Sequence, residues 1–191
     1  MQRTSFRRMH CSLARALDAV GEWWTPLVLR DLYLGLTRFD QLHRDLGISA
    51  KVLTQRLAAL VAAGIVERRA YQMHPRRHAY RLTEKGRALV PPLLALMAWG
   101  DRWASPDGKP PLLLRHQPCG RVIRAQVTCS HCGRELDASE VIPLPGPGGA
   151  RAPGTALLAE LLRPSLSRSS AGARRRQRAI RSSGPRSPSL H

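Results

Sequence analysis

The 191 residues suffice for one domain of ordinary size with appendages, and 31 Lys and Arg against 13 Asp and Glu give a net charge of +18. This charge makes polyanions the leading class of partner. Four cysteines, three of them close together, favour a metal site in a reduced compartment over a secreted disulfide framework. No run of about 18 apolar residues occurs, which argues against a membrane span.

The start of the chain is basic, and residues 1–10 are expected to form an arm ahead of the first helix. A secretory signal would need an unbroken apolar stretch, which Arg15 and Asp18 interrupt. We therefore expect a cytoplasmic protein that does not enter a membrane, associated with the nucleoid if its polyanionic partner is DNA.

Apolar periodicity predicts two helices near the start of the chain. The first spans residues 12–20, carries an apolar face, and has Gly21 as its natural stop. The second begins near Thr25, which can cap it, with Pro26 at the favoured first helical position. Its apolar residues extend to Leu36.

A short helix over residues 39–46 follows and is broken by Gly47. Ser49 can then cap a fourth helix that runs to about Ala63 and ends at Gly64. At about 100° per residue, this fourth helix separates an apolar arc from a polar arc. The apolar arc holds Leu53, Leu57 and Leu60, and the polar arc holds Lys51, Thr54 and Gln55.

The pattern then changes to that of a β-hairpin. Residues 65–71 and 79–82 each predict a strand, and residues 72–78 between them form a basic connection that contains Pro75. Thr83 caps a closing helix that extends to Trp103.

Two prolines interrupt that closing helix. Pro91 and Pro92 must kink or split it, because neither can donate a backbone hydrogen bond. Three helices, a capped fourth, two strands and a closing helix follow the order of a winged helix-turn-helix, in which the second helix of the motif enters the major groove.

The expected fold is mainly α with a small β-hairpin. A winged helix-turn-helix domain is followed by a small zinc-ribbon-like module and by a basic tail that is too poor in apolar residues to fold. The expected segments are an arm (1–10), a DNA-binding and dimerisation domain (11–104), a linker (105–114), the module (115–142) and a largely disordered tail (143–191).

The sequence also resembles the HxlR family of bacterial transcription regulators, relatives of the MarR group. The resemblance covers roughly residues 10–104. Its blocks are CSLARALDAVGEWWTPLVLRDLYLGLTRFDQLHRDLGISAKVLTQRLAALVAAGIVERRAY and HAYRLTEKGRALVPPLLALMAWGDRW. One departure is the pair Glu22-Trp23, where the family usually has a glycine or basic residue before its tryptophan. Trp24 aligns with the family tryptophan, which leaves Trp23 unexplained.

The resemblance implies homodimers that bind a pseudo-palindromic operator near a promoter, mostly as repressors and sometimes as activators. It also implies that the first and last helices form the dimer interface. The last helix has apolar side chains that suit this use, namely Leu93, Leu96, Met97, Trp99 and Trp103. Some family members sense oxidants through a cysteine just before the first helix, where Cys11 lies in this chain.

Lys51, Thr54 and Gln55 are the candidate contacts to base edges, with Ser49 at the start of the same helix. Glutamine can bind adenine through two hydrogen bonds, and lysine prefers guanine or phosphate. The alternative is a merely solvated helix face. Arg56 projects away from this arc, so a structural ion pair is as reasonable an interpretation as a phosphate contact.

Four arginines around the hairpin are candidates for phosphate or minor-groove contact. They are Arg68, Arg69, Arg76 and Arg77. The alternative is a charged hairpin that only promotes solubility. His74 and His78 are interpreted as polar loop residues rather than as ligands.

Cys11 is a candidate redox sensor. It lies at a helix start, and positive charge and a helix N-terminus both stabilise a thiolate. The basic residues nearby in sequence are Arg7, Arg8, His10 and Arg15. Thiolates are the species that oxidants attack. The alternative is a small buried apolar residue.

A cysteine-rich segment contains His116, Cys119, Cys129 and Cys132, spaced as H-x2-C-x9-C-x2-C. Three thiolates and one imidazole would satisfy tetrahedral zinc with no open position, which indicates a structural site. His131 competes with His116 as the fourth ligand. Reduced free thiols or a redox pair are the alternatives.

The tail contains Arg174-Arg175-Arg176-Gln177-Arg178, which could hold nucleic acid non-specifically. This tail motivates an alternative function as an RNA-binding or ribosome-associated basic protein. We do not expect an enzyme, because the sequence has no nucleophile elbow, phosphate loop, dinucleotide fingerprint or paired carboxylates. The sequence does not identify a small-molecule effector.

Overall fold

The computed structural model describes residues 5–6, 8–74, 76–105 and 109–162. Two units are distinguished within the chain. One is Ala16–Ala138, and the other combines Met1–Arg15 with Ser139–His191. The basic run at 174–178 and the rest of the predicted tail beyond residue 162 lie outside the described residues.

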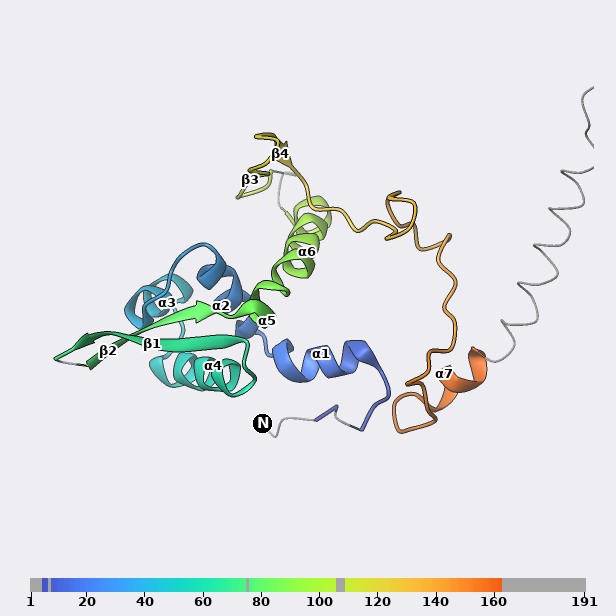
Figure 1. The fold of residues 1–191 in the computed structure, drawn as a ribbon, viewed down its shortest axis with the longest axis horizontal. Helices are drawn as coiled ribbons and strands as arrows, with labels where there is room; N and C mark the ends of the chain where they lie inside the picture. The colour runs from blue at the N-terminus through green and yellow to red at the C-terminus, as the bar shows by residue number, and fades with distance from the viewer. Residues whose placement is uncertain (1–4, 7, 75, 106–108, 163–191) are drawn as a thin grey trace, which may run out of the picture. The chain divides into compact units, whose positions relative to one another are not determined.

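Four helices open the structure, in the order predicted (Figure 1). They are α1 (Ser12–Val20), α2 (Trp24–Tyr33), α3 (Phe39–Leu46) and α4 (Ala50–Ala62). The predicted bounds of α1 and α3 are confirmed.

Helix α2 begins at Trp24, close to the predicted start near Thr25, but the prediction that Thr25 caps it is wrong. The backbone N–H of Thr25 donates to the carbonyl of Glu22 at 2.8 Å, so a turn precedes the helix and Trp23 already has helical dihedral angles. Thr25 lies inside the helix and is buried. Pro26 still falls in the first turn, where its missing N–H costs no hydrogen bond.

The turn between α3 and α4 forms as the sequence predicts. Gly47 ends α3 with φ +64°, a left-handed conformation that glycine adopts without steric cost. The side chain of Ser49 accepts a hydrogen bond from the Val52 amide at 3.3 Å and so caps α4.

The hairpin is longer than predicted. Its strands are β1 (Val66–Met73) and β2 (Arg76–Leu82), which pair antiparallel from Val66↔Leu82 to Met73↔Arg76 with a bulge between Ala70 and Gln72. The expected loop at 72–78 is therefore wrong for most of its length, and Pro75 lies outside the described residues. Apart from Met73, the added strand residues are polar and show no apolar alternation, but main-chain pairing does not require apolar side chains.

A third segment extends this sheet at its base. Arg38 forms an antiparallel bridge with Ala79, and the Tyr80 amide donates to the carbonyl of Thr37 at 2.7 Å. The chain just before α3 is thereby attached to β2, which fixes the hairpin to the helix-turn-helix.

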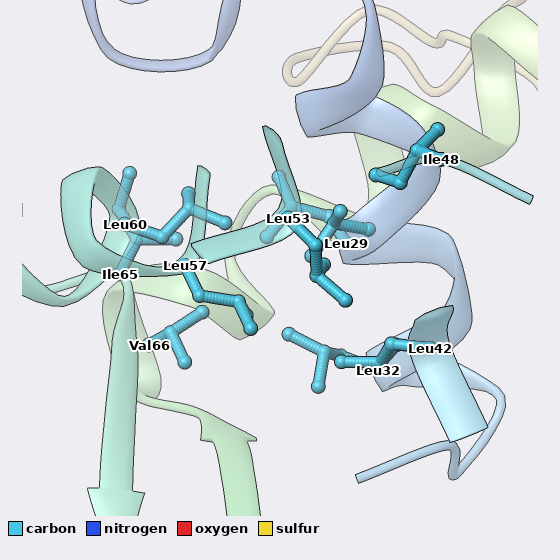
Figure 2. Close-up of a cluster of buried hydrophobic side chains, with 10 residues drawn as sticks. Leu29, Leu32, Leu42, Ile48, Leu53, Leu57, Leu60, Ile65 and Val66 are labelled. Atoms are coloured by element: carbon cyan, nitrogen blue, oxygen red, sulfur yellow. The ribbon is translucent and has the colours of Figure 1, made fainter. Parts of the chain in front are cut away.

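One apolar core holds these elements together. It combines residues of α2, α3, α4 and the start of β1, and Figure 2 shows these side chains converging between the helices. Burial of each large aliphatic side chain stabilises the fold by about 1.5–3 kcal/mol. The core residues are Val28, Leu29, Leu32, Leu42, Ile48, Leu53, Leu57, Leu60, Ile65 and Val66.

The closing helix is split, as the two prolines predict. A short α5 (Glu84–Arg87) is capped by Thr83, whose side chain accepts from the Gly86 amide at 3.1 Å. The longer α6 (Val90–Trp103) starts next to Pro91 and Pro92 and contacts α2.

The cysteine-rich segment contains a two-stranded ladder, β3 (Leu114–Arg115) with β4 (Val122–Ile123). In the other unit, the segment predicted to be a largely disordered tail contains a short helix, α7 (Ala156–Leu161). Across the residues that the structure describes, every helix is too short or too polar to cross a lipid bilayer.

Candidate nucleic-acid interface

Helix α4 presents a polar face to solvent because its leucines hold it against the core. Leu53, Leu57 and Leu60 are at most 1 % exposed. Lys51, Thr54 and Gln55 are all exposed. The predicted separation into two arcs therefore exists, and the polar residues can reach a molecule placed alongside the helix.

Two neighbouring candidates have structural partners. The hydroxyl oxygen of Ser49 accepts the capping hydrogen bond, and its O–H group can still donate to a phosphate. Arg56 pairs with Glu22 at 3.2 Å, and its side chain is 19 % exposed. Of the two interpretations of Arg56, the structure contains the ion pair, which ties α4 to the segment between α1 and α2.

The hairpin β1–β2 lies next to α4 and extends beyond the helices (Figure 1). Arg76 and Arg77 lie at its far end, paired across the ladder with Met73 and Gln72, and both are exposed. Since β2 begins at Arg76, these arginines are held on a strand and not on a flexible loop.

The two arginines on β1 are exposed, but each contacts a neighbouring side chain. Arg68 donates to Nδ1 of His78 at 2.9 Å, and Arg69 pairs with Glu67 at 2.8 Å. Desolvation, together with the nearby charges of Arg68 and Arg76, lowers the pKa of His78. His78 is therefore neutral at neutral pH and can accept the hydrogen bond from Arg68.

The sequence interpretation missed one candidate, Arg44 on α3. In a helix-turn-helix the first helix crosses the DNA backbone, so a basic residue on its exposed face is suited to phosphate contact. Arg44 is exposed and forms no ion pair within the described part of the chain. Its position in the last turn of the helix before Gly47 could have pointed to it.

Asp31 is a buried carboxylate that the sequence interpretation did not consider. One oxygen pairs with Arg30 at 2.6 Å, and the other, Oδ2, has no hydrogen-bond partner among the described residues. Burial raises the pKa of Asp31, and the hydrogen bond and charge of Arg30 oppose that rise. Because Asp31 belongs to α2 and lies beneath the surface, we expect its ionisation to affect stability rather than binding.

Cys11 is half-buried, and lies just before α1 as expected. With His10 and Arg15 it lines a cavity of about 600 Å³ whose other walls come from residues 145–162. Nδ1 of His10 is 3.2 Å from the carbonyl oxygen of Gly148. The cysteine is thus near two basic side chains, though its surface is only partly open to reagents.

The four predicted zinc ligands occur in two separate pairs. His116 Nδ1 lies 3.3 Å from Cys119 Sγ, whereas Cys129 and Cys132 lie in a second loop. Hydrogen bonds from the backbone of Cys132 and His131 lower the pKa of Cys129. In the described residues, no three Cys, His, Asp or Glu side chains are gathered closely enough to ligate one metal ion.

Comparison with known proteins supports the winged helix-turn-helix. The profile described as "HxlR-like helix-turn-helix" matches residues 19–108. The HTH-type transcriptional regulators Mb3122 of Mycobacterium bovis and Rv3095 of Mycobacterium tuberculosis are each 47 % identical over 137 residues, which is 72 % of this chain and 87 % of theirs.

Two solved structures show the same fold. PA1607, described as a candidate transcription factor, has a TM-score of 0.65 at 34 % identity, covering 73 % of this chain and 98 % of its own. PA1374 from Pseudomonas aeruginosa, described in the same way, has a TM-score of 0.51 at 38 % identity, covering 73 % of this chain and 95 % of its own. With the fold, the profile and these relatives in agreement, the chain belongs to the HxlR-like helix-turn-helix family.

Proposed function

We propose that this protein is a sequence-specific DNA-binding transcription regulator that acts as a homodimer on a pseudo-palindromic operator, most often as a repressor. The observation that carries the proposal is the exposed polar face of α4, backed by Leu53, Leu57 and Leu60. The mycobacterial relatives are named HTH-type transcriptional regulators, which agrees with the proposal. No catalytic role is proposed.

Each part of the surface has its own task in this proposal. Thr54 and Gln55 read base edges from α4, and Lys51 contacts guanine or phosphate. Ser49 and Arg44 contact phosphates beside the groove, and the hairpin arginines contact the backbone or minor groove farther out. Arg56 serves mainly to fix α4 through Glu22.

A winged helix needs a second copy to read a two-fold operator, with half-sites about 10 base pairs apart. Helix α6 is apolar yet has no buried residue, which suits it to bind another protomer. We therefore assign dimerisation to this helix.

The test is selection of bound fragments from a random DNA pool by the full chain, followed by affinity measurement on the preferred duplex. Combined replacement of Lys51, Thr54 and Gln55 by alanine is expected to weaken binding at least about 100-fold, since a single bidentate base contact is worth about 1–3 kcal/mol. The variant should keep its thermal stability, because all three side chains are exposed.

Lys109→Ala is the matched control for the removal of a positive charge, since Lys109 is exposed and lies outside the winged helix. It is expected to bind the preferred duplex as the parent does. If the triple variant remained folded and bound that duplex with undiminished affinity, the assignment of α4 as the reading helix would be wrong.

Redox control through Cys11 is a further part of the proposal, supported by its place before α1 and by Arg15 and His10 beside it. Oxidation of the thiol is expected to change operator affinity, and Cys11→Ser should abolish that change. Equal responses of the parent and the variant to oxidant would remove Cys11 from this role.

The alternative is an RNA-binding or ribosome-associated protein. This alternative is based on the basic tail, which lies outside the described residues. Competition between structured RNA and the selected duplex separates the two functions, and preference for the RNA would overturn the regulator proposal.

A further inference from the structure

Two loops in the cysteine-rich segment have the same build. Residues 116–121 read HQPCGR and residues 129–134 read CSHCGR, so the last three residues of each loop are identical. In each loop the first and fourth positions carry a side chain that can bind a soft or borderline metal ion. These positions are His116 and Cys119 in the first loop, and Cys129 and Cys132 in the second.

The backbone of the two loops repeats as closely as their sequence. In each loop the amide of the first residue donates to the carbonyl of the sixth, at 2.9 Å from His116 and 2.8 Å from Cys129. The amide of the fifth residue, a glycine, donates to the carbonyl of the first, at 2.8 Å for Gly120 and 2.9 Å for Gly133.

The glycines and the flanking residues complete the match. Gly120 and Gly133 have φ +70° and +73°, so each reverses the chain in a conformation that disfavours other residues. Each loop is also closed by an antiparallel pair that joins the residue before it to the residue after it. These pairs are Arg115↔Val122 and Thr128↔Glu135.

The side chains in each loop are placed as a pair of ligands would be. His116 Nδ1 and Cys119 Sγ are 3.3 Å apart, so both point to the same side of the first loop. In the second loop, the backbone amides of Cys132 and His131 donate to the sulfur of Cys129.

A second observation is that this segment has no core. Among residues 115–142 none is buried, and only Ala125 and Cys129 are half-buried. Two hairpin loops without apolar burial cannot offset the conformational entropy that their ordering costs. Small modules of this kind are commonly stabilised by a bound metal ion.

We propose that the two loops close on one Zn²⁺ ion, ligated by His116, Cys119, Cys129 and Cys132. Three thiolates and one imidazole give a closed tetrahedral set, so the site is structural rather than catalytic. Because the described residues hold no gathered group of three ligands, each loop supplies one preformed pair and the pairs approach one another when the metal binds. The repeat favours His116 over His131, since His116 occupies the position that corresponds to Cys129.

The experiment uses the full chain, purified under reducing conditions and then analysed for metal. About one zinc per chain is expected. Replacement of zinc by Co²⁺ should give the absorption of tetrahedral cobalt together with a thiolate-to-cobalt charge-transfer band. Removal of zinc with a chelator should make three thiols reactive to a thiol reagent, and added zinc should protect them again.

Variants then assign the ligands. Cys119→Ala, Cys129→Ala and Cys132→Ala should each reduce bound zinc to below about a tenth of the parent value and abolish the cobalt charge-transfer band or shift it. Cys11→Ser is the matched control, because it removes the one cysteine outside the set and should keep one zinc per chain. His116→Ala should weaken zinc binding, and His131→Ala should not.

Several results would overturn the proposal. Reduced full-length protein that contains no zinc and takes up neither zinc nor cobalt would do so, as would a Cys129–Cys132 disulfide in its place. Retention of zinc by the cysteine variants would also exclude these ligands. None of these readouts depends on DNA binding, so the zinc site and the regulator function are tested separately.

Discussion

At the scale of single residues, Asp31 shows a conflict between burial and charge. Its side chain is 1 % exposed, and Oδ2 has no hydrogen-bond partner among the described residues. Since burial raises the pKa of the folded state above the value of an unfolded chain, the folded protein binds the Asp31 proton more tightly. Stability therefore falls as pH rises through the interval from the unfolded pKa, about 3.8, to the folded one.

Asp31→Asn should remove this dependence while keeping an oxygen that can accept from Arg30. The stability of the variant relative to the parent is expected to increase with pH above about 4, because an ionised buried carboxylate is no longer present. Urea unfolding of the parent and the variant at a series of pH values measures this difference in stability.

Asp40→Asn is the matched control, since it makes the same change at a side chain that is 64 % exposed. Parallel pH profiles for the parent and Asp31→Asn would show that ionisation of Asp31 does not limit stability.

At the scale of elements, the helices were predictable where local chemistry decides their ends. Gly47 and Ser49 mark the turn of the helix-turn-helix, and the leucine spacing identifies the buried face of α4. The absence of a side-chain cap on α2 was not predictable, because a turn at Glu22 precedes the helix and the Glu22 side chain pairs with Arg56, far along the chain. Such a pairing depends on tertiary structure and leaves no periodic signal in the sequence.

The ends of the hairpin strands were also not predictable from the sequence. Its ends carry polar side chains, so apolar alternation stops before the strands do, and the strand that holds Arg76 and Arg77 was mistaken for a loop. The basic composition still identified both residues as candidates. The sequence thus identified the two basic residues, but it did not show that they lie on a paired strand.

The hairpin arginines should contribute to DNA affinity without contributing to sequence preference. Replacing Arg76 and Arg77 together by glutamine is expected to weaken binding to all duplexes alike. The slope of log K against log salt should become shallower by about 0.9 for each phosphate that the protein no longer neutralises. Affinities measured at several salt concentrations, for preferred and random duplexes, test this.

Lys109→Gln, at an exposed site outside the hairpin, is expected to leave the slope unchanged. A salt slope in the double variant equal to that of the parent would mean that the hairpin does not touch the DNA backbone.

At the scale of the whole molecule, helix α6 carries large apolar side chains that are exposed to solvent in the single chain. Leu96, Trp99 and Trp103 lie at positions i, i+3 and i+7 and are 60 %, 59 % and 66 % exposed. Exposed apolar residues at helical spacing form a stripe that another protein can cover. Leu93 on the same helix instead packs against the core of this chain.

A second copy of the chain is the partner that the proposed operator symmetry requires. The variant Leu96→Glu with Trp99→Glu should place two charges on the stripe and prevent dimerisation. Sedimentation is expected to give the mass of two chains for the parent and of one chain for the variant. Binding to a two-fold operator should weaken by about 10²–10⁴-fold, while binding to an isolated half-site stays unchanged, because only the linkage between two reading heads is removed.

Leu34→Glu is the control for an added charge at an exposed apolar site, since Leu34 is 50 % exposed but lies just after α2 and outside the stripe. It should remain a dimer. If the α6 variant also remained a dimer, the two-fold contact would have to be made elsewhere on the protein. If the parent were a monomer at every concentration and bound a single half-site as tightly as the full operator, then two-fold recognition itself would be wrong. Recognition by one copy of α4 and its hairpin would then account for all binding.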